Sequence, residues 1–360
     1  MTPQFNSLRV VDVRRETADS VSVRFEVPAP LRAAYRFAAG QFLTLRTVLD
    51  GKEERRSYSI CCGEDDYARD GELRVAIKRV AGGRFSTWAN AELRVGDMLD
   101  VMTPDGRFQA PPRGQEPVHY AAFAAGSGIT PVLALIKTLL ARQPRSRFTL
   151  VYGNRKVDSI LFLEELEDLK DRYVDRLALH HVLSRQPQES DLLHGRLDQD
   201  RCGRFLDTLL AADGIDEFFV CGPEGMIDSA QAALLARAVE PGCIHIERFG
   251  VPDAARAQPE PVERDGEAAA LTVILDGKTH EMRLPRSGTS VLDTALDAGL
   301  DLPYACKGGV CCTCRARLLE GEVRMDRNYT LEPDEIARGF VLTCQSHPLT
   351  DRIVVSYDER

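Results

Sequence analysis

Short stretches of alternating apolar and polar residues fill the first third of the chain. Turn-forming pairs such as Ala39-Gly40, Asp50-Gly51 and Asp70-Gly71 separate them. Alternation with a period of two predicts half-buried strands. The expected strands are Leu8–Val13, Ser20–Val27, Phe42–Thr47, Glu72–Arg79 and Met98–Thr103. Short strands joined by tight turns predict a small antiparallel β-barrel domain over residues 1–113.

The pattern changes at Pro111-Pro112-Arg113-Gly114, after which apolar runs alternate with stretches of helical periodicity. The expected strands are His119–Ala124, Arg147–Tyr152, Leu177–Leu183 and Glu217–Val220, and the expected helices are Pro131–Ala141, Ser159–Arg172 and Gly225–Val239. Strand–helix alternation predicts an α/β domain with a parallel sheet covered on both faces, over residues 114–250.

Residues 251–268 are rich in Pro, Ala, Glu and Asp and contain few large apolar residues. This composition predicts an exposed linker. Alternation resumes beyond it, with expected strands Leu271–Leu275 and Thr279–Leu284 and a helix over Ser290–Ala298. Residues 269–360 are therefore expected to form a third domain.

Length and charge limit the possible functions. A chain of 360 residues has room for two or three domains. The net charge of -9 argues against nucleic acid as a main partner. The N-terminus has no apolar signal segment, and glycines and a proline interrupt the most apolar stretch, 121–136. A soluble cytoplasmic protein without a membrane partner is expected.

The spacing of four of the ten cysteines carries the strongest chemical signal. Cys306, Cys311 and Cys314 form a C-x4-C-x2-C pattern, and Cys344 follows thirty residues later. This spacing is typical of plant-type 2Fe-2S ferredoxins, and Cys312 falls outside it. The alternatives are a structural zinc site, in a non-enzymatic metal-binding interaction protein, or reduced core cysteines. Zinc sites usually contain two C-x2-C pairs, which do not occur here.

A glycine-rich turn, Gly126-Ser-Gly-Ile-Thr-Pro131, follows the expected strand His119–Ala124 and precedes a helix. Glycines let the backbone approach a pyrophosphate, and the helix N-terminus offers unpaired N–H groups. Many α/β proteins also use such a turn for packing alone, and the strand–turn–helix context favours nucleotide binding over that alternative.

Two motifs in the first domain could bind a second nucleotide. Arg56-Ser-Tyr58-Ser59 combines a cation, an aromatic ring and a hydroxyl, and Gly82-Gly83-Arg84-Phe85-Ser86 follows downstream. These groups could clamp a phosphate, stack on a ring and hydrogen-bond its edge. On chemistry alone, an exposed strand with a cation and a β-forming tyrosine is the stronger interpretation of the first motif.

The order of these motifs, followed by Cys221-Gly222-Pro223-x-x-Met226, resembles the ferredoxin–NADP reductase superfamily, in the group with a C-terminal plant-type ferredoxin domain. The resemblance covers essentially the whole chain and implies an FAD-binding β-barrel, an NAD(P)-binding α/β domain and an α+β ferredoxin domain of β-grasp type. The ending, with Asn328-Tyr329, 340–346 and 354–358, is similar to the reductase subfamily of bacterial phenylacetyl-CoA epoxygenases.

The resemblance implies roles for the flavin-domain residues. Arg56 would bind the flavin phosphate, Tyr58 would stack on the isoalloxazine, and Ser59 would hydrogen-bond near its N5. The remaining FAD-binding residues would be Lys78, Gly82, Gly83 and Ser86, of which the last three would hold the pyrophosphate. A pyrophosphate site favours FAD over FMN.

The resemblance also implies a nicotinamide site. The nucleotide-binding residues would be Gly126, Gly128, Thr130, Ser184, Arg185, Cys221, Gly222 and Pro223. Ser184 and Arg185 would hold the 2′-phosphate of NADPH, and Cys221 would lie beside the nicotinamide. Glu247 and Phe249 would form a closing element beside the flavin. The alternatives are a buried small hydrophobe for Cys221, a solvated carboxylate for Glu247 and an ordinary surface cation for Arg185.

The implied catalytic residues are Tyr58, Ser59, Cys221 and Glu247, and the implied cluster ligands are Cys306, Cys311, Cys314 and Cys344. NADPH gives two electrons together as hydride, whereas an oxygenase iron centre accepts them singly. FAD and the 2Fe-2S cluster would convert one mode into the other. The implied partner is the di-iron oxygenase of an epoxygenase that acts on phenylacetyl-CoA in phenylacetate degradation. A reductase for another ring hydroxylase or for a hybrid-cluster protein is the alternative.

Overall fold

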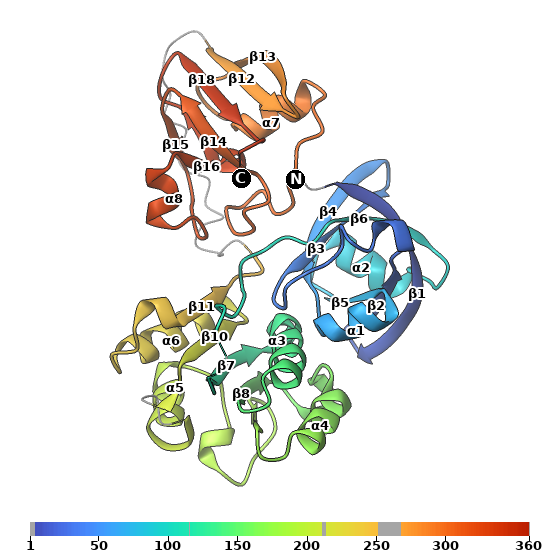
Figure 1. Cartoon of the computed structure of the whole chain (residues 1–360), viewed down its shortest axis with the longest axis vertical. Helices are drawn as coiled ribbons and strands as arrows, with labels where there is room; N and C mark the ends of the chain where they lie inside the picture. The colour runs from blue at the N-terminus through green and yellow to red at the C-terminus, as the bar shows by residue number, and fades with distance from the viewer. Residues whose placement is uncertain (1–3, 115, 211–213, 251–267, 360) are drawn as a thin grey trace. The chain divides into compact units, whose positions relative to one another are not determined.

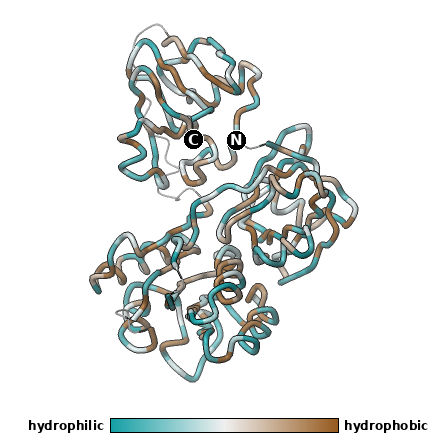
Figure 2. Tube along the Cα trace, in the orientation of Figure 1, coloured by the Kyte–Doolittle hydropathy of each residue, from teal (hydrophilic) through white to brown (hydrophobic). Residues whose placement is uncertain are grey.

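The computed structural model describes residues 4–114, 116–210, 214–250 and 268–359. They belong to two compact units. One comprises Asn6–Glu54 and Tyr58–Phe249, and the other is built mainly on the residues from Gly250 onward. Hydrophobic stretches run through each unit (Figure 2). No helix in the described ranges is long and apolar enough to cross a membrane.

The N-terminal part of the first unit is a six-stranded antiparallel sheet in the order β4-β3-β6-β1-β2-β5 (Figure 1). Its strands are β1 (Phe5–Thr17), β2 (Ser20–Glu26), β3 (Phe42–Leu49), β4 (Lys52–Ser59), β5 (Glu72–Lys78) and β6 (Met98–Met102). Val21, Val23 and Phe25 of β2 alternate into its core. A bridge between Ile60 and Val75 joins the two edges of the sheet, which therefore closes into the predicted barrel.

The barrel also contains elements that the sequence pattern did not predict. The strand β4 is polar and shows no apolar alternation, although it carries Arg56, Tyr58 and Ser59. Two short helices, α1 (Glu64–Asp70) and α2 (Arg84–Ala91), were also missed. The interpretation of Asp70-Gly71 as a turn between strands was wrong. Gly71 instead ends α1 in a left-handed conformation, with φ of 71°.

The remainder of this unit is a parallel sheet in the order β11-β10-β7-β8-β9, which confirms the predicted α/β domain. Its strands are β7 (His119–Ala125), β8 (Arg147–Asn154), β9 (Leu177–Leu183), β10 (Glu217–Cys221) and β11 (Ile244–Glu247). Helices α3 (Ile129–Arg142) and α4 (Leu163–Arg172) cover one face, and α5 (Gln199–Phe205) and α6 (Glu224–Leu235) cover the other (Figure 1). The short elements α5 and β11 were not predicted.

The strand order places the loops after β7 and β10 next to each other. The chain builds outward from β7 to β8 and β9 on one side, and returns to β10 and β11 on the other. Ligands of such sheets bind at the carboxyl edge where this direction changes. In the register, Ala124 pairs with Cys221 and Cys221 pairs with Glu247. Both predicted catalytic residues of this domain therefore lie at that edge.

The second unit contains a mixed sheet in the order β13-β12-β18-β14-β16 and a small β15-β17 pair. Its elements are β12 (Ala269–Leu275), β13 (Lys278–Leu284), α7 (Val291–Asp297), β14 (Arg315–Glu320), β15 (Val323–Met325), α8 (Pro333–Ala337), β16 (Phe340–Leu342), β17 (Ser346–Pro348) and β18 (Arg352–Ser356). Leu292 and Ala295 of α7 pack with Val273 and Val355 of the sheet. The predicted linker lies, except for residue 268, outside the described residues.

A partly buried group of charges joins the barrel to the parallel sheet within the first unit. Glu165 of α4 accepts hydrogen bonds from Arg74 of β5 at 2.8 Å and from Lys137 of α3 at 2.9 Å. Lys137 also pairs with Asp66 of α1 at 2.7 Å. Burial alone would raise the pKa of Glu165, but the two cations lower it below its ordinary value. The carboxylate is therefore ionised and holds the two domains together.

The first prediction tests this junction. Glu165→Gln should lower the unfolding free energy of the flavin-loaded protein by about 2 kcal/mol, because Arg74 loses its countercharge and Lys137 keeps only that of Asp66. For a unit of this size, the loss corresponds to a fall of about 4–8 °C in the midpoint of thermal unfolding. Circular dichroism and flavin fluorescence would both follow the transition.

Glu164→Gln is the matched control. Glu164 is the preceding residue on α4 and also pairs with a barrel arginine, Arg14, at 3.0 Å. That carboxylate is 83% exposed, so its substitution should change the unfolding free energy by less than about 0.5 kcal/mol. Equal shifts for the two variants would contradict the role given to Glu165.

Candidate functional site

Three predicted catalytic residues meet at the carboxyl edge of the parallel sheet. The hydroxyl of Ser59, at the end of β4, donates to the carboxyl Oε2 of Glu247 in β11 at 3.1 Å. Cys221 ends β10 beside Glu247 and is fully buried. The barrel thus contributes Ser59, and the parallel sheet contributes the acid and the thiol.

The surroundings keep these groups neutral. Glu247 as a residue is only partly buried, but other protein atoms enclose its carboxyl. Desolvation raises its pKa to about 8, and the hydrogen bond from Ser59 opposes only part of this rise. Burial, and secondarily the nearby Glu247, raises the pKa of Cys221 well above its ordinary value. A neutral acid hydrogen-bonded to a hydroxyl can exchange a proton, whereas a protonated buried thiol serves as a packing surface.

Tyr58 and Arg56 lie two residues apart on β4 and therefore point to the same side of the strand. The Tyr58 ring is half-buried and packs at 5.7 Å from the ring of Phe85. Contact with Phe85 fixes the tyrosine orientation, as stacking on a planar ligand requires.

The glycine pair downstream shapes a turn into α2. Gly82 has a φ of 72°, which a residue with a side chain rarely adopts, and α2 starts directly after Gly83 without a side-chain cap. Ser86 is buried, and its hydroxyl accepts from the backbone N–H of Val80 at 3.1 Å. The serine therefore holds the turn, while backbone N–H groups at the helix start can face a phosphate.

The glycine-rich loop after β7 has the same design. Thr130 is buried and donates to the carbonyl of Ser127 at 2.9 Å, so it also braces its loop. A Cβ on Gly128 would lie 2.1 Å from the carbonyl oxygen of Cys221, and only glycine allows this approach. The loop is thus packed directly on Cys221-Gly222, and α3 begins there without a side-chain cap.

The ends of β8 and β9 place two arginines together. The Arg185 N–H donates to the Arg155 carbonyl at 2.9 Å, and Ser184 donates to the carbonyl of Asn154. Arg185 is exposed and pairs with no carboxylate in the described part of the chain. Arg155 was missed by the sequence analysis, although its position after the apolar run Arg147–Tyr152 matches that of Arg185 after β9.

Three other predicted site residues lie at or beside the ends of strands and helices. Lys78 ends β5 and pairs with Asp19 at 3.6 Å. Phe249 is 45% exposed, just beyond β11. Pro223 precedes the first residue of α6, where a missing N–H is tolerated.

The four predicted cluster ligands are arranged as two pairs of thiols. Cys306 interacts with Cys311, and Cys314 with Cys344, closely enough that each thiol shifts the pKa of its neighbour. The neighbouring Cys311 thiol and backbone N–H groups, including that of Gly308, lower the pKa of Cys306 below its ordinary value. No three histidine, cysteine or carboxylate side chains of the described residues converge on one ion. Each iron of a 2Fe-2S cluster takes two thiolates, so the two pairs of thiols fit the cluster.

Cys312 has a different environment from these four. Its backbone has a φ of 53°, and its thiol donates to the hydroxyl of Thr330 at 2.9 Å. That hydroxyl donates in turn to the carbonyl of Gly309. The side chain therefore braces the outside of the cysteine loop.

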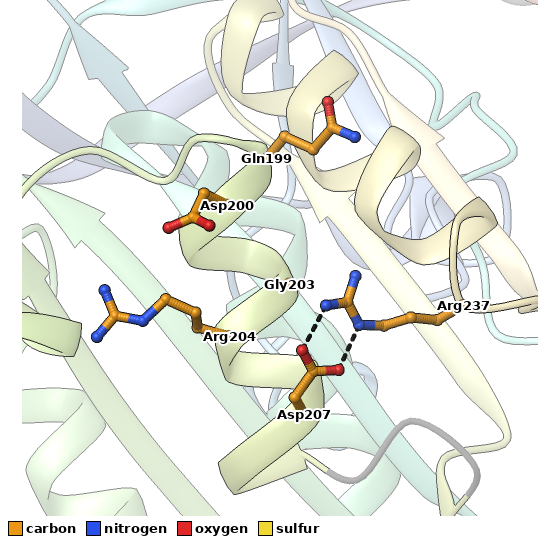
Figure 3. Close-up of a pocket in the computed structure, with 6 residues that line it drawn as sticks. All are labelled: Gln199, Asp200, Gly203, Arg204, Asp207 and Arg237. Carbon is orange, nitrogen blue, oxygen red and sulfur yellow. Dashed lines mark hydrogen bonds and ion pairs between the residues drawn. The ribbon is translucent and has the colours of Figure 1, made fainter.

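A polar surface hollow lies between α5 and the end of α6 (Figure 3). It is lined by Gln199, Asp200, Gly203, Arg204, Asp207 and Arg237. Both arginines are paired, Arg237 with Asp207 and Arg204 with Asp191. None of the predicted site residues lines this hollow.

A barrel with a phosphate-type turn, a parallel sheet with a dinucleotide loop, and two pairs of cysteines define a class of protein. They form a nicotinamide-dependent electron-transfer reductase that contains a flavin and an iron-sulfur cluster. Residues 7–110 match the oxidoreductase FAD-binding domain, residues 123–232 the oxidoreductase NAD-binding domain, and residues 273–349 the 2Fe-2S iron-sulfur cluster binding domain. FAD, the 2Fe-2S cluster and NAD(P)H are accordingly its cofactors and cosubstrate.

Individual relatives span the whole chain. One subunit of the 1,2-phenylacetyl-CoA epoxidase of Escherichia coli K12 is 47% identical over 99% of this chain and 98% of its own. The ferredoxin reductase component of 3-ketosteroid-9-alpha-monooxygenase from Mycolicibacterium smegmatis is 36% identical over 98% and 97%. The solved structure of phthalate dioxygenase reductase shares the fold, with a TM-score of 0.58 and 24% identity over 98% of both chains. The chain belongs to the ferredoxin–NADP reductase superfamily, in the group with a C-terminal 2Fe-2S ferredoxin domain.

The second prediction concerns Glu247. Because its pKa in the folded protein is raised, the folded state binds more protons than the unfolded state between about pH 4.5 and 8. Stability from this group is therefore present at low pH and is lost as the pH rises through about 8. Glu247→Gln should become more stable relative to the wild type as the pH rises, as measured by denaturation midpoints from pH 5 to 9.

Glu240→Gln serves as the control, because Glu240 is exposed on the turn before β11. It makes the same replacement of a carboxyl by an amide, but at an exposed position. If the wild-type and Glu247→Gln midpoints stayed parallel across the range, the carboxyl would not be desolvated in the folded protein.

Proposed function

We propose that this chain is the reductase component of a multicomponent oxygenase that epoxidises the ring of phenylacetyl-CoA. It would take hydride from NADPH at FAD and pass single electrons through the 2Fe-2S cluster to a di-iron oxygenase partner. The observation that carries the proposal is the 47% identity to a phenylacetyl-CoA epoxidase subunit over 99% of the chain. None of the ten cysteines, all of which lie within the described residues, forms a disulfide, which favours a reducing, cytoplasmic location.

The proposed division assigns residues 1–113 to FAD, 114–250 to the nicotinamide nucleotide, 251–268 to a linker and 269–360 to the cluster. Each of the three family matches falls within one of these domains. In the first two, the proposed binding residues are Arg56, Tyr58, Lys78, Gly82, Gly83 and Ser86 for FAD, and Gly126, Gly128, Thr130, Ser184, Arg185, Gly222 and Pro223 for the nucleotide.

The proposed chemistry of this chain's residues centres on four side chains. Tyr58 would stack on the flavin ring, and Cys221 would form the wall against which the nicotinamide packs. The Ser59 hydroxyl is hydrogen-bonded to the Glu247 carboxyl, whose pKa of about 8 keeps it protonated at neutral pH. The pair would therefore hold a proton close to the flavin. FAD, when bound, supplies the step from hydride to single electrons.

The proposed nucleotide is NADPH rather than NADH. Two arginines, Arg155 and Arg185, follow adjacent strands and are joined through their backbones. An acidic residue at this place would suit a free ribose hydroxyl, but Ser184 and Arg185 occupy it. Paired cations favour a 2′-phosphate.

The third prediction tests this nucleotide choice. Arg185→Ala removes a charge-assisted contact worth roughly 1.5–3 kcal/mol. The KM for NADPH should rise about tenfold or more, whereas the KM for NADH should barely change. Steady-state reduction of ferricyanide measures both. Equal increases for the two nucleotides would show that Arg185 does not recognise the phosphate.

The fourth prediction tests the electron path in the full-length protein. Cys311→Ser should remove most of the cluster but leave FAD bound, since the proposed FAD-binding residues lie in the barrel domain and not in the ferredoxin domain. The variant should still reduce ferricyanide with NADPH. It should fail to reduce cytochrome c efficiently and fail to support phenylacetyl-CoA epoxidation by the purified oxygenase. Iron analysis and the visible spectrum report the cofactor content.

Cys312→Ser is its matched control, since the neighbouring thiol contacts Thr330 and should leave the cluster intact. A cluster-free Cys311→Ser protein that still drove the oxygenase would overturn the proposed path. The second candidate function is that of a reductase for a different oxygenase, as the 36% identical component of a 3-ketosteroid monooxygenase suggests. An intact protein that drove such a monooxygenase but not the epoxidase would favour it.

A further inference from the structure

Gln345 directly follows Cys344 in a short helical turn, Thr343–Gln345, and its side chain is buried. Its amide nitrogen Nε2 lies 3.4 Å from the sulfur of Cys344 in donor geometry. The same nitrogen donates to the carbonyl of Cys344 at 2.9 Å and to the carbonyl of Lys307 at 3.0 Å. The Gln345 amide therefore lies between Cys344 and the loop that carries the other three proposed ligands, Cys306, Cys311 and Cys314.

Its second contact explains why the amide stays in place. Lys307 follows Cys306 and has a φ of 49°, in the left-handed region. Its ammonium is anchored to Asp293 at 2.7 Å and lies over the Tyr304 ring. The Lys307 carbonyl takes one of the two amide hydrogens of Gln345, and the other N–H is shared between the carbonyl and the sulfur of Cys344.

We propose that Gln345 is a positioning residue that sets the reduction potential of the cluster through its N–H···S contact with Cys344. Accepting an electron adds negative charge that spreads onto the cysteine sulfurs. A fixed N–H dipole directed at one of these sulfurs stabilises the reduced form, so it raises the reduction potential. The neutral amide achieves this without a buried charge.

Gln345→Met tests the proposal, since methionine keeps the length and burial but cannot donate. We expect full iron content and a one-electron reduction equilibrium about tenfold less favourable, a fall of about 59 mV in midpoint potential. Spectroelectrochemical titration of the full-length holoprotein measures it. An unchanged potential at full iron content would overturn the proposal.

Tyr357→Phe is the matched control. The Tyr357 hydroxyl is buried and bonds to Thr343 at 2.6 Å, and Thr343 donates to the Cys314 carbonyl rather than to a sulfur. Tyr357→Phe therefore perturbs the segment around Cys344 but removes no hydrogen-bond donor to a cysteine sulfur. A fall of the same size in this variant would mean that general loosening, not the N–H···S contact, shifts the potential.

The unsubstituted protein provides an independent measurement. Gln345 is the sole glutamine between residues 269 and 360. Glutamine labelled with 15N at the side-chain amide therefore marks one nitrogen in that region. Pulsed EPR of the dithionite-reduced cluster should detect hyperfine coupling to it, and the absence of coupling would contradict the contact.

This inference rests on the proposed ligand set, and the two can fail separately. If Cys344→Ser retained its iron, the ligand assignment would be wrong. If that variant lost iron while Gln345→Met kept both its iron and its potential, only the role of Gln345 would be wrong.

Discussion

The carboxylate of Glu165 lies between Arg74 of the barrel and Lys137 of the parallel-sheet domain. Two ion pairs, Arg74–Glu165 and Lys137–Asp66, cross from the barrel to the parallel-sheet domain, and separating the domains would break both of them. The packing of the barrel on the parallel-sheet domain also places Ser59 next to Glu247 at the carboxyl edge of the sheet. Ser59 can hydrogen-bond to Glu247 only while the barrel is held in this position against α3 and α4. A pair of groups from two domains thus depends on an ion pair elsewhere in their interface.

The two loops that would bind the nucleotides are both held by hydrogen bonds within the loop. Their polar side chains, Ser86 and Thr130, bond within their own loops. Gly82 and Gly126 supply backbone conformations with positive φ, and Gly128 allows a close approach to Cys221. Side chains therefore determine the shape, and backbone N–H groups at the starts of α2 and α3 are left to face phosphates. A rigid loop loses little entropy when a ligand binds.

In the ferredoxin domain, side chains likewise shape the loop that would hold the cluster. In the proposed ligand set, two pairs of thiols would supply two ligands for each iron, while Cys312 and Gln345 contact the same loop. Of these two, only Gln345 also reaches a ligand sulfur. The ligand set would hold the cluster, and the neighbouring donor would tune it.

Local patterns determined much of this protein. Periodicity predicted the barrel, the parallel sheet and α7, because each element buries one face. Cysteine spacing predicted the cluster, because a single loop must reach both irons. The pattern failed for β4 and β11, which are polar or very short, and for α1, whose C-terminal Asp70-Gly71 resembles a hairpin turn.

Only the tertiary structure decided which distant groups meet. Ser59 and Glu247 are 188 residues apart, Arg74 and Glu165 are 91 apart, and Lys307 and Gln345 are 38 apart. Strand order, register and domain packing bring these pairs together. A local pattern records which side of an element is buried, but not which other element covers it. The residue types in the site could therefore be read from the sequence, whereas their hydrogen bonds and the raised pKa of Glu247 required the folded chain.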